Sequence, residues 1–124
     1  MGNLVAEPVP ALVVWGIPSC STVKKARTFL TDRGIAHRFA DLRAAPPSTS
    51  TIELWAAAFG TRAMRNTSGG SYRALPEDKD SWSDARWIKE FAGDPMLIKR
   101  PVIERDGKAI LIGFKDDDVA RVFS

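Results

Sequence analysis

The sequence predicts an α/β fold in which helices cover a mixed sheet of about four strands. Three observations support this prediction. A strand–helix–strand pattern occupies residues 11–42, helical patterns fill the middle of the chain, and two short apolar runs near the end flank Asp106–Gly107. The first pattern is typical of parallel strands and the last of an antiparallel hairpin, so one sheet has to combine both kinds of pairing.

The strand–helix–strand unit begins with the apolar residues 11–15, which we interpret as a short buried strand. Gly34 is a helix stop, and residues 35–42 alternate loosely between apolar and polar side chains, as a second strand does. Between the two strands, apolar side chains recur at the spacing of a helix, at Val23, Ala26 and Leu30. Strands joined by such a crossover helix are parallel, and the connection is right-handed.

The middle of the chain is predicted to be mainly helical. Residues 44–48 read as a linker rich in alanine and proline. Helical patterns then run from Ser50 to Gly60 and lie within residues 81–91, where Ser83 is a candidate N-cap. Residues 66–71 contain two adjacent glycines, which favour a loop.

The last third predicts two strands and a helix. Residues 102–104 and 109–112, which are mostly apolar, flank a turn whose Asp-Gly pair is a strong hairpin signal. Three aspartates at 116–118 favour the N-terminus of a final helix that ends near Phe123, because carboxylates stabilise the positive end of the helix dipole.

Size and composition are typical of one globular domain. The chain has 124 residues, 44% of them hydrophobic and 27% charged, and we expect the domain to span residues 11–124 behind a flexible tail of residues 1–10. The tail lacks the features of a signal peptide, and no stretch is apolar enough to span a membrane. A single cysteine forms no internal disulfide, so we expect a cytoplasmic protein.

The charge distribution favours a small anionic ligand over a duplex. The net charge is +3, and lysines and arginines are scattered among acids, which argues against direct binding of nucleic acid. Local cationic clusters occur at residues 24–27 and at Lys99–Arg100. We expect no metal site, because Cys20 and His37 are the only cysteine and histidine. We expect no bound cofactor either.

Cys20 lies between the first strand and the first helix, where Ser21 or Thr22 is placed to cap the helix. Unpaired backbone N–H groups and the positive end of the helix dipole favour a thiolate there, and Lys24 adds positive charge. A free cysteine is also commonly a small buried hydrophobe, but the polar, turn-like segment around Cys20 favours a reactive thiol. A cysteine at the first strand–helix junction, in this order of elements, is the thioredoxin-like arrangement.

Six segments carry a pattern that resembles a known family: Gly16–Arg27, Asp41–Arg43, Arg65–Thr67, Ser71–Leu75, Pro95–Val102 and Gly113–Phe114. Together they resemble the arsenate-reductase-like family, which includes the ArsC arsenate reductases, the Spx transcriptional regulators and the YffB-type proteins. The resemblance runs from about Leu12 to Phe123. It is specific because a Leu-Ile-Lys-Arg-Pro sequence follows the cysteine segment about 80 residues later. The cysteine segment itself is most similar to the YffB-type branch.

The resemblance implies a thioredoxin-like fold with an inserted helical portion at about residues 48–93. It implies that Cys20 is the catalytic nucleophile and that Arg100 helps to hold an anion beside it. It also implies that Pro101 faces Cys20 and follows a cis peptide bond. We expect the Arg100 side chain to face the solvent.

The sequence departs from the arsenate reductases where they bind the oxyanion. The position matched to one of their arginines is Asn66, with Arg65 one residue away, and the segment of the final arginine offers Phe114 and then Lys115. An incomplete set of guanidinium groups weakens an oxyanion clamp, so arsenate reduction is an alternative function. Val23 replaces the second cysteine of the Spx redox switch, so a non-enzymatic Spx-like regulator that binds RNA polymerase is a second alternative.

The resulting hypothesis is a glutathione-dependent thiol reductase. A single nucleophilic cysteine has to pass its mixed disulfide to an external thiol, and glutathione is abundant and anionic. The expected partners are glutathione or another small thiol, and glutaredoxin. Around the catalytic pair Cys20 and Arg100, the expected substrate-binding residues are Ser21, Thr22, Lys24, Asn66 and Pro101.

Overall fold

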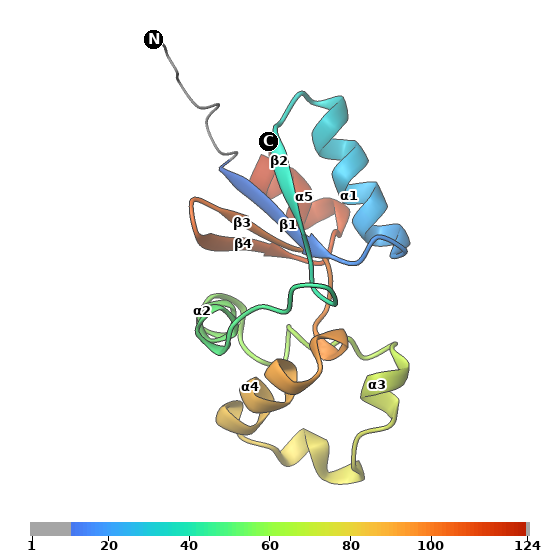
Figure 1. Cartoon of the computed structure of the whole chain (residues 1–124), viewed down its shortest axis with the longest axis vertical. Helices are drawn as coiled ribbons and strands as arrows, with labels where there is room; N and C mark the ends of the chain where they lie inside the picture. The colour runs from blue at the N-terminus through green and yellow to red at the C-terminus, as the bar shows by residue number, and fades with distance from the viewer. Residues whose placement is uncertain (1–10, 124) are drawn as a thin grey trace.

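A computed structural model describes residues 11–123, which form a four-stranded sheet and its surrounding helices (Figure 1). The expected tail of residues 1–10 lies outside the described residues. The strand order is β2-β1-β3-β4, with β1 parallel to β2 and antiparallel to β3, and β3 antiparallel to β4. The predicted mixed sheet is therefore confirmed. Its strands are β1 (Leu12–Gly16), β2 (His37–Asp41), β3 (Val102–Arg105) and β4 (Lys108–Ile112).

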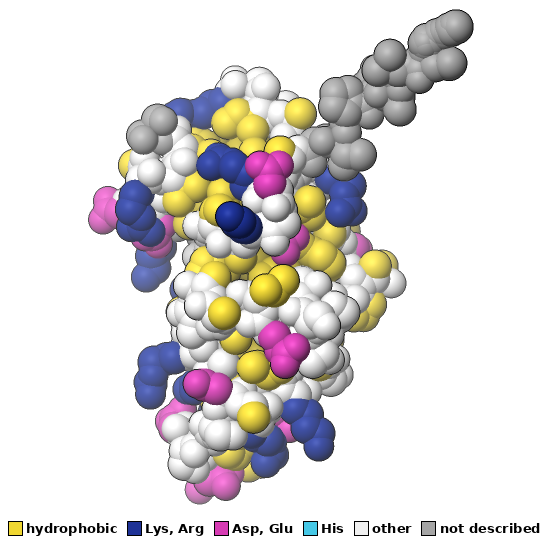
Figure 2. All heavy atoms as spheres, turned by 90° about the vertical axis from the view of Figure 1, so that its left-hand side faces the viewer, with side chains coloured by type: hydrophobic (Ala, Val, Ile, Leu, Met, Phe, Trp, Pro, Cys, Tyr) yellow, Lys and Arg dark blue, Asp and Glu magenta, His cyan; other side chains and the backbone are white. Residues whose placement is uncertain are grey.

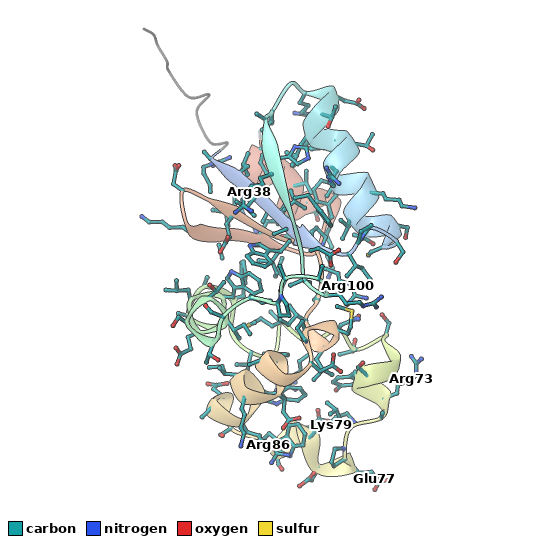
Figure 3. The ribbon with its side chains drawn as sticks, in the orientation of Figure 1. Arg38, Arg73, Glu77, Lys79, Arg86 and Arg100 are labelled. Carbon is teal, nitrogen blue, oxygen red and sulfur yellow. The ribbon has the colours of Figure 1, made fainter. Side chains whose placement is uncertain are left out.

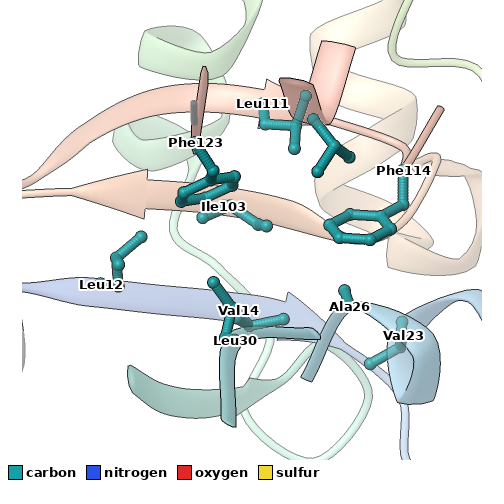
Figure 4. Close-up of a cluster of buried hydrophobic side chains, with 10 residues drawn as sticks. Leu12, Val14, Val23, Ala26, Leu30, Ile103, Leu111, Phe114 and Phe123 are labelled. Atoms are coloured by element: carbon teal, nitrogen blue, oxygen red, sulfur yellow. The ribbon is translucent and has the colours of Figure 1, made fainter. Parts of the chain in front are cut away.

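Two helices, α1 (Ser21–Asp32) and α5 (Asp116–Phe123), cover one face of this sheet. Figure 4 shows the core between the two layers, in which side chains of three strands meet those of both helices. Burying such side chains stabilises the fold by about 1.5–3 kcal/mol each. The core residues are Leu12, Val14, Val23, Ala26, Leu30, Ile103, Leu111, Phe114, Val119 and Phe123.

The chain between β2 and β3 forms a helical portion below the sheet (Figure 1). A second core lies here, with the fully buried rings of Trp55, Trp87 and Phe91 at its centre. The elements are α2 (Thr49–Phe59), α3 (Gly70–Arg73), α4 (Asp84–Gly93) and the 3₁₀ turns η1 (Glu77–Ser81) and η2 (Pro95–Leu97).

The predicted helix starts agree with the structure in some places and differ from it in others. Ser83 caps α4, as predicted, and its side chain accepts a hydrogen bond from the Arg86 amide at 3.2 Å. The predicted cap of α1 is wrong, because Cys20 is the N-cap and Ser21 is already helical. The predicted loop 66–71 runs into α3, a helix of four residues that is too short to leave a periodic pattern.

Glu104 on β3 joins α2 to the sheet. The indole of Trp15 on β1 donates to one carboxylate oxygen at 2.8 Å, and the indole of Trp55 on α2 donates to the other at 2.9 Å. The two rings meet edge to face, with centroids 5.4 Å apart. Because both oxygens are occupied, a half-buried carboxylate fixes the position of α2 over the sheet.

Figure 2 looks onto the side of the molecule on which α2 lies, where hydrophobic side chains gather at mid-height between more charged regions. Leu54 of α2 is 61% exposed. A single exposed leucine is ordinary for a protein surface and needs no partner to explain it. Of the helices within residues 11–123, none has the length and apolar character to cross a membrane.

We predict that Glu104→Gln lowers the free energy of unfolding by about 1–3 kcal/mol. The amide nitrogen would place a donor opposite an indole N–H, so one of the two hydrogen bonds is lost. Urea unfolding followed by tryptophan fluorescence measures the change. Glu53→Gln is the matched control, because Glu53 is an exposed glutamate of α2, and it should alter stability by less than about 0.5 kcal/mol. Equal stability of the two variants would contradict a role for Glu104 in fixing α2.

Candidate active site

Cys20 is the N-cap residue of α1, with an extended backbone (φ −77°, ψ 122°). Its amide donates to the carbonyl of Ile17 at 3.2 Å, and its carbonyl accepts from the amide of Lys24 at 3.0 Å. The Cys20 side chain makes no capping hydrogen bond within the described residues, so the first-turn N–H groups remain available beside the thiol. Cys20 is half-buried and packs against both cores.

Gly16 lets the end of β1 approach the first turn of α1 closely. A Cβ atom at this position would lie 2.5 Å from one methyl group of Val23 and 2.9 Å from the other. Val23 is almost fully buried, so it has no room to move away. The contact therefore fixes the start of α1, and with it Cys20, at the end of β1.

The wall of the site opposite Cys20 consists of two segments that pair through their backbones. The amide of Asn66 donates to the carbonyl of Leu97 at 2.8 Å, and the amide of Lys99 donates to the carbonyl of Met64 at 2.7 Å. One segment lies between α2 and α3, and the other runs from the end of η2 to β3. The pairing therefore places Asn66 and Lys99 on the same side of the site.

Pro101 follows a cis peptide bond, as the family resemblance implied. Its carbonyl accepts a hydrogen bond from the amide of Gly113 at 2.8 Å. This bond brings the segment after β4 next to the segment before β3. Pro101 is itself buried and supports the wall without lining it.

Cys20 opens into a pocket of about 470 Å³ whose walls come from four separate parts of the chain. Three lining residues are cationic, Lys99, Arg100 and Lys115, and none of the lining residues is acidic. A nucleophile beside converging positive charges suits an anionic substrate. The lining residues are Cys20, Thr22, Asn66, Ser68, Gly69, Lys99, Arg100, Gly113, Phe114 and Lys115.

Arg100 is half-buried, so the expectation that it faces the solvent is wrong. Figure 3 shows it where the sheet meets the helical portion. Its Nη1 donates to the carbonyls of Met96 at 3.2 Å and Ile98 at 3.3 Å. Its Nε is buried and has no hydrogen-bond partner within residues 11–123. The carbonyls fix the direction of the guanidinium group toward the pocket.

Asn66 lines the pocket, whereas Arg65 points away from it. The Asn66 amide nitrogen donates to the Met96 carbonyl at 3.3 Å. The Arg65 guanidinium lies 4.2 Å from the ring centroid of Trp87, and its Nη1 is 3.6 Å from an oxygen of Asp80. Arg65 therefore does not replace the missing arginine of the arsenate reductases in this pocket.

Three of the predicted substrate-binding residues, Ser21, Lys24 and Pro101, do not line the pocket. Ser21 is exposed, and Lys24 lies over a separate hollow on α1. The other cations of this helix also point elsewhere. Lys25 is 3.8 Å from Asp116, and Arg27 lies 4.6 Å from the ring centroid of Phe39. Each helical residue turns its side chain by about 100°, so cations close to Cys20 in sequence leave its surroundings.

Lys99 and Lys115 supply positive charge in place of Lys24. The Lys99 side chain extends across Gly113, where a Cβ atom would lie 3.1 Å from its Cε. The sequence contained a signal for Lys99, which stands beside Arg100 in a conspicuous cationic pair. Lys115 offered only its place after the Gly-Phe segment, because its approach to Cys20 depends on the tertiary fold.

Curated proteins similar to this chain include one of Haemophilus influenzae and one of Listeria innocua. The H. influenzae protein, described as uncharacterized, is 35% identical over 114 residues, covering 91% of this chain and 99% of the relative. The L. innocua protein is described as the global transcriptional regulator Spx. It is 27% identical over 106 residues, covering 84% of this chain and 80% of the relative.

Solved structures also resemble the chain along nearly its whole length. A structure described as the YFFB protein matches with a TM-score of 0.82 and 35% identity, covering 91% of this chain and 99% of that one. A possible arsenate reductase from Streptococcus mutans matches with a TM-score of 0.78 and 32% identity, covering 90% and 98%. These matches confirm the predicted thioredoxin-like class. The model of the ArsC family matches residues 15–122, and the chain belongs to that family.

Proposed function

We propose that this chain is a glutathione-dependent thiol reductase that acts through Cys20. The observation that carries the proposal is the pocket in which the Cys20 thiol, at the start of α1, faces three cations and no acid. Glutathione has two carboxylates, so such a pocket suits it. The free thiol fits the reducing cytoplasm, where we propose that the protein works.

The proposed reaction is an exchange of disulfides in two steps. The Cys20 thiolate attacks the glutathione sulfur of a mixed disulfide, forms a Cys20–glutathione disulfide and releases the other partner as a thiolate. The thiolate of a second glutathione then attacks this adduct, which yields glutathione disulfide and restores the Cys20 thiolate. The chain has one cysteine, so the second thiol has to be external. Glutaredoxin is a further candidate for that step.

The surrounding residues would bind and orient the glutathione. Lys99, Arg100 and Lys115 would hold its carboxylates, since all three line the pocket. The planar guanidinium of Arg100 is already oriented by two carbonyls, so it loses little freedom on binding. The first-turn amides of α1 would stabilise the thiolate, both before attack and when it leaves the adduct.

Arsenate reduction is the second candidate. The cationic pocket favours it, as does the similarity to the possible arsenate reductase of S. mutans. The small number of guanidinium groups argues against arsenate reduction. Arg100 is the one arginine among the lining residues, and Arg65 points toward Asp80. Two lysines hold a tetrahedral oxyanion with charge but without the paired donor geometry of arginine.

A regulator that binds RNA polymerase is the third candidate, supported by the 27% identity to the L. innocua Spx protein. Residue 23, one helical turn after Cys20, is a buried valine, so the chain lacks a dithiol switch at this place. The non-enzymatic reading predicts that a complex with RNA polymerase forms equally well with Cys20→Ser.

We predict that Cys20 forms one mixed disulfide with glutathione. Mass spectrometry after incubation with glutathione disulfide should show a single adduct, which added glutathione or dithiothreitol removes. Cys20→Ser should show no adduct, and iodoacetamide should alkylate folded wild type at pH 7 faster than it alkylates the urea-unfolded chain, because unfolding removes the helix start. Slower alkylation of the folded protein would contradict the nucleophilic role. Efficient arsenate turnover with glutaredoxin would reverse the ranking of the two enzymatic candidates.

We predict that Arg100→Ala weakens the binding of glutathione about tenfold or more, because a charge-assisted hydrogen bond contributes about 1.5–3 kcal/mol. Arg100→Lys should have an intermediate affinity, since it keeps the charge but loses the planar donor group. Titration calorimetry with Cys20→Ser as the background measures binding without reaction. Arg62→Ala is the control, because Arg62 is exposed and does not line the pocket.

The same Arg100→Ala variant should lose about 1 kcal/mol of stability, because Nη1 bonds to two carbonyls in the folded chain. Urea unfolding of the variant therefore accompanies the titration. A folded Arg100→Ala protein that binds glutathione as wild type does would place the anion site elsewhere.

A further inference from the structure

The positive charge of the chain is concentrated on one structural unit. Residues 21–43, which form α1 and β2, contain six lysines and arginines and two aspartates. The remainder contains twelve lysines and arginines and thirteen acids. The α1–β2 unit thus carries a net charge of +4, whereas the rest of the chain carries −1. This unit contributes Thr22 to the pocket, but none of its cations lines it.

β2 is an edge strand whose outer side pairs with no strand within residues 11–123. The amide of Leu42 donates to the carbonyl of Gly16 at 2.8 Å, so the backbone groups of residue 42 face β1. Because these groups alternate along a strand, those of Ala40 and Arg38 also face β1. The N–H and C=O groups of His37 and Phe39 are therefore directed outward, which leaves a ready template for an added strand.

Cations lie on both faces of this edge. Phe39 packs toward α1, and the Arg27 guanidinium lies 4.6 Å from its ring centroid. Arg38 is exposed, and the alternation of side chains places it on the opposite face (Figure 3). Lys24 shares a hollow with Arg27. In the part of the chain that the structure describes, no carboxylate oxygen lies within 4 Å of the charged groups of these three residues.

We propose that the β2 edge binds an extended acidic segment of a partner protein, which adds to the sheet as a fifth strand. The outward backbone groups of His37 and Phe39 would pair with the segment. Arg27 and Arg38 would each meet carboxylates on one face of it, since the side chains of an added strand also alternate. The same cations repel the β2 edge of a second copy, and a nucleic acid has no backbone that continues the strand ladder.

The test uses the full chain and a fluorescein-labelled peptide of repeated Glu-Glu-Val-Val, which carries carboxylates on both faces of a strand and is long enough to span the five residues of β2. Fluorescence polarisation should show binding that weakens with added salt. Arg38→Glu should weaken it about tenfold or more, because attraction becomes repulsion at an exposed position. Arg62→Glu, the same charge change outside the unit, should weaken it by less than about twofold.

Two further arms test the strand pairing and the class of partner. The same peptide with N-methyl groups on every amide keeps its charge but loses the backbone donors of both edges, so it should not bind. In wild-type protein, peptide binding should slow the hydrogen exchange of the His37 and Phe39 amides. Equal binding of the methylated peptide, equal effects of Arg38→Glu and Arg62→Glu, or stronger binding of an oligonucleotide of the same charge would each overturn the proposal. None of these readouts involves Cys20, so they are independent of the proposed thiol chemistry.

Discussion

Two backbone hydrogen bonds between residues 64–66 and 97–99 hold the site together. They join the segment between α2 and α3 to the segment directly before β3. Without them, Asn66 and Lys99 would have no fixed position relative to Cys20, which the sheet holds from the other side. The pocket is therefore a product of the junction between two cores, and a helical portion packed on its own would not create it.

Local pattern was enough to predict the four strands and the helices α1, α2, α4 and α5, because each of them carries its own signal. An apolar run, a helical period and an Asp-Gly turn each depend on neighbours in sequence. The hydrogen bonds of Glu104 with Trp15 and Trp55 left no such signal, since the two tryptophans are 89 and 49 positions away from it in the sequence. Its place on β3 was predictable, but its partners were a matter of tertiary packing.

In the candidate site too, local motifs predicted some of the lining residues, and tertiary packing determined the others. Cys20, Thr22, Asn66 and Arg100 were found from motif and resemblance, and the structure brings them into one pocket. Lys24 does not line this pocket, because proximity in sequence to a helix start does not imply proximity in space. Lys115 lines the pocket but was not among the predicted substrate-binding residues, since ninety-five positions of sequence separate it from Cys20. The rotation of successive side chains around α1 directs Lys24 away from the pocket, and the turn after β4 brings Lys115 to it.

Val23 connects the packing of the fold to the chemistry that the site is able to perform. Its methyl groups occupy the space beside Gly16, and its side chain is 1% exposed. This position is one helical turn beyond Cys20, where a dithiol protein would place a resolving cysteine. In this chain the position serves the core, so the start of α1 gains a tight contact with β1 and has no second thiol. An adduct on Cys20 consequently has to be resolved by a molecule that enters the cationic pocket from outside, and the affinity of that pocket for anionic thiols becomes the property on which turnover depends.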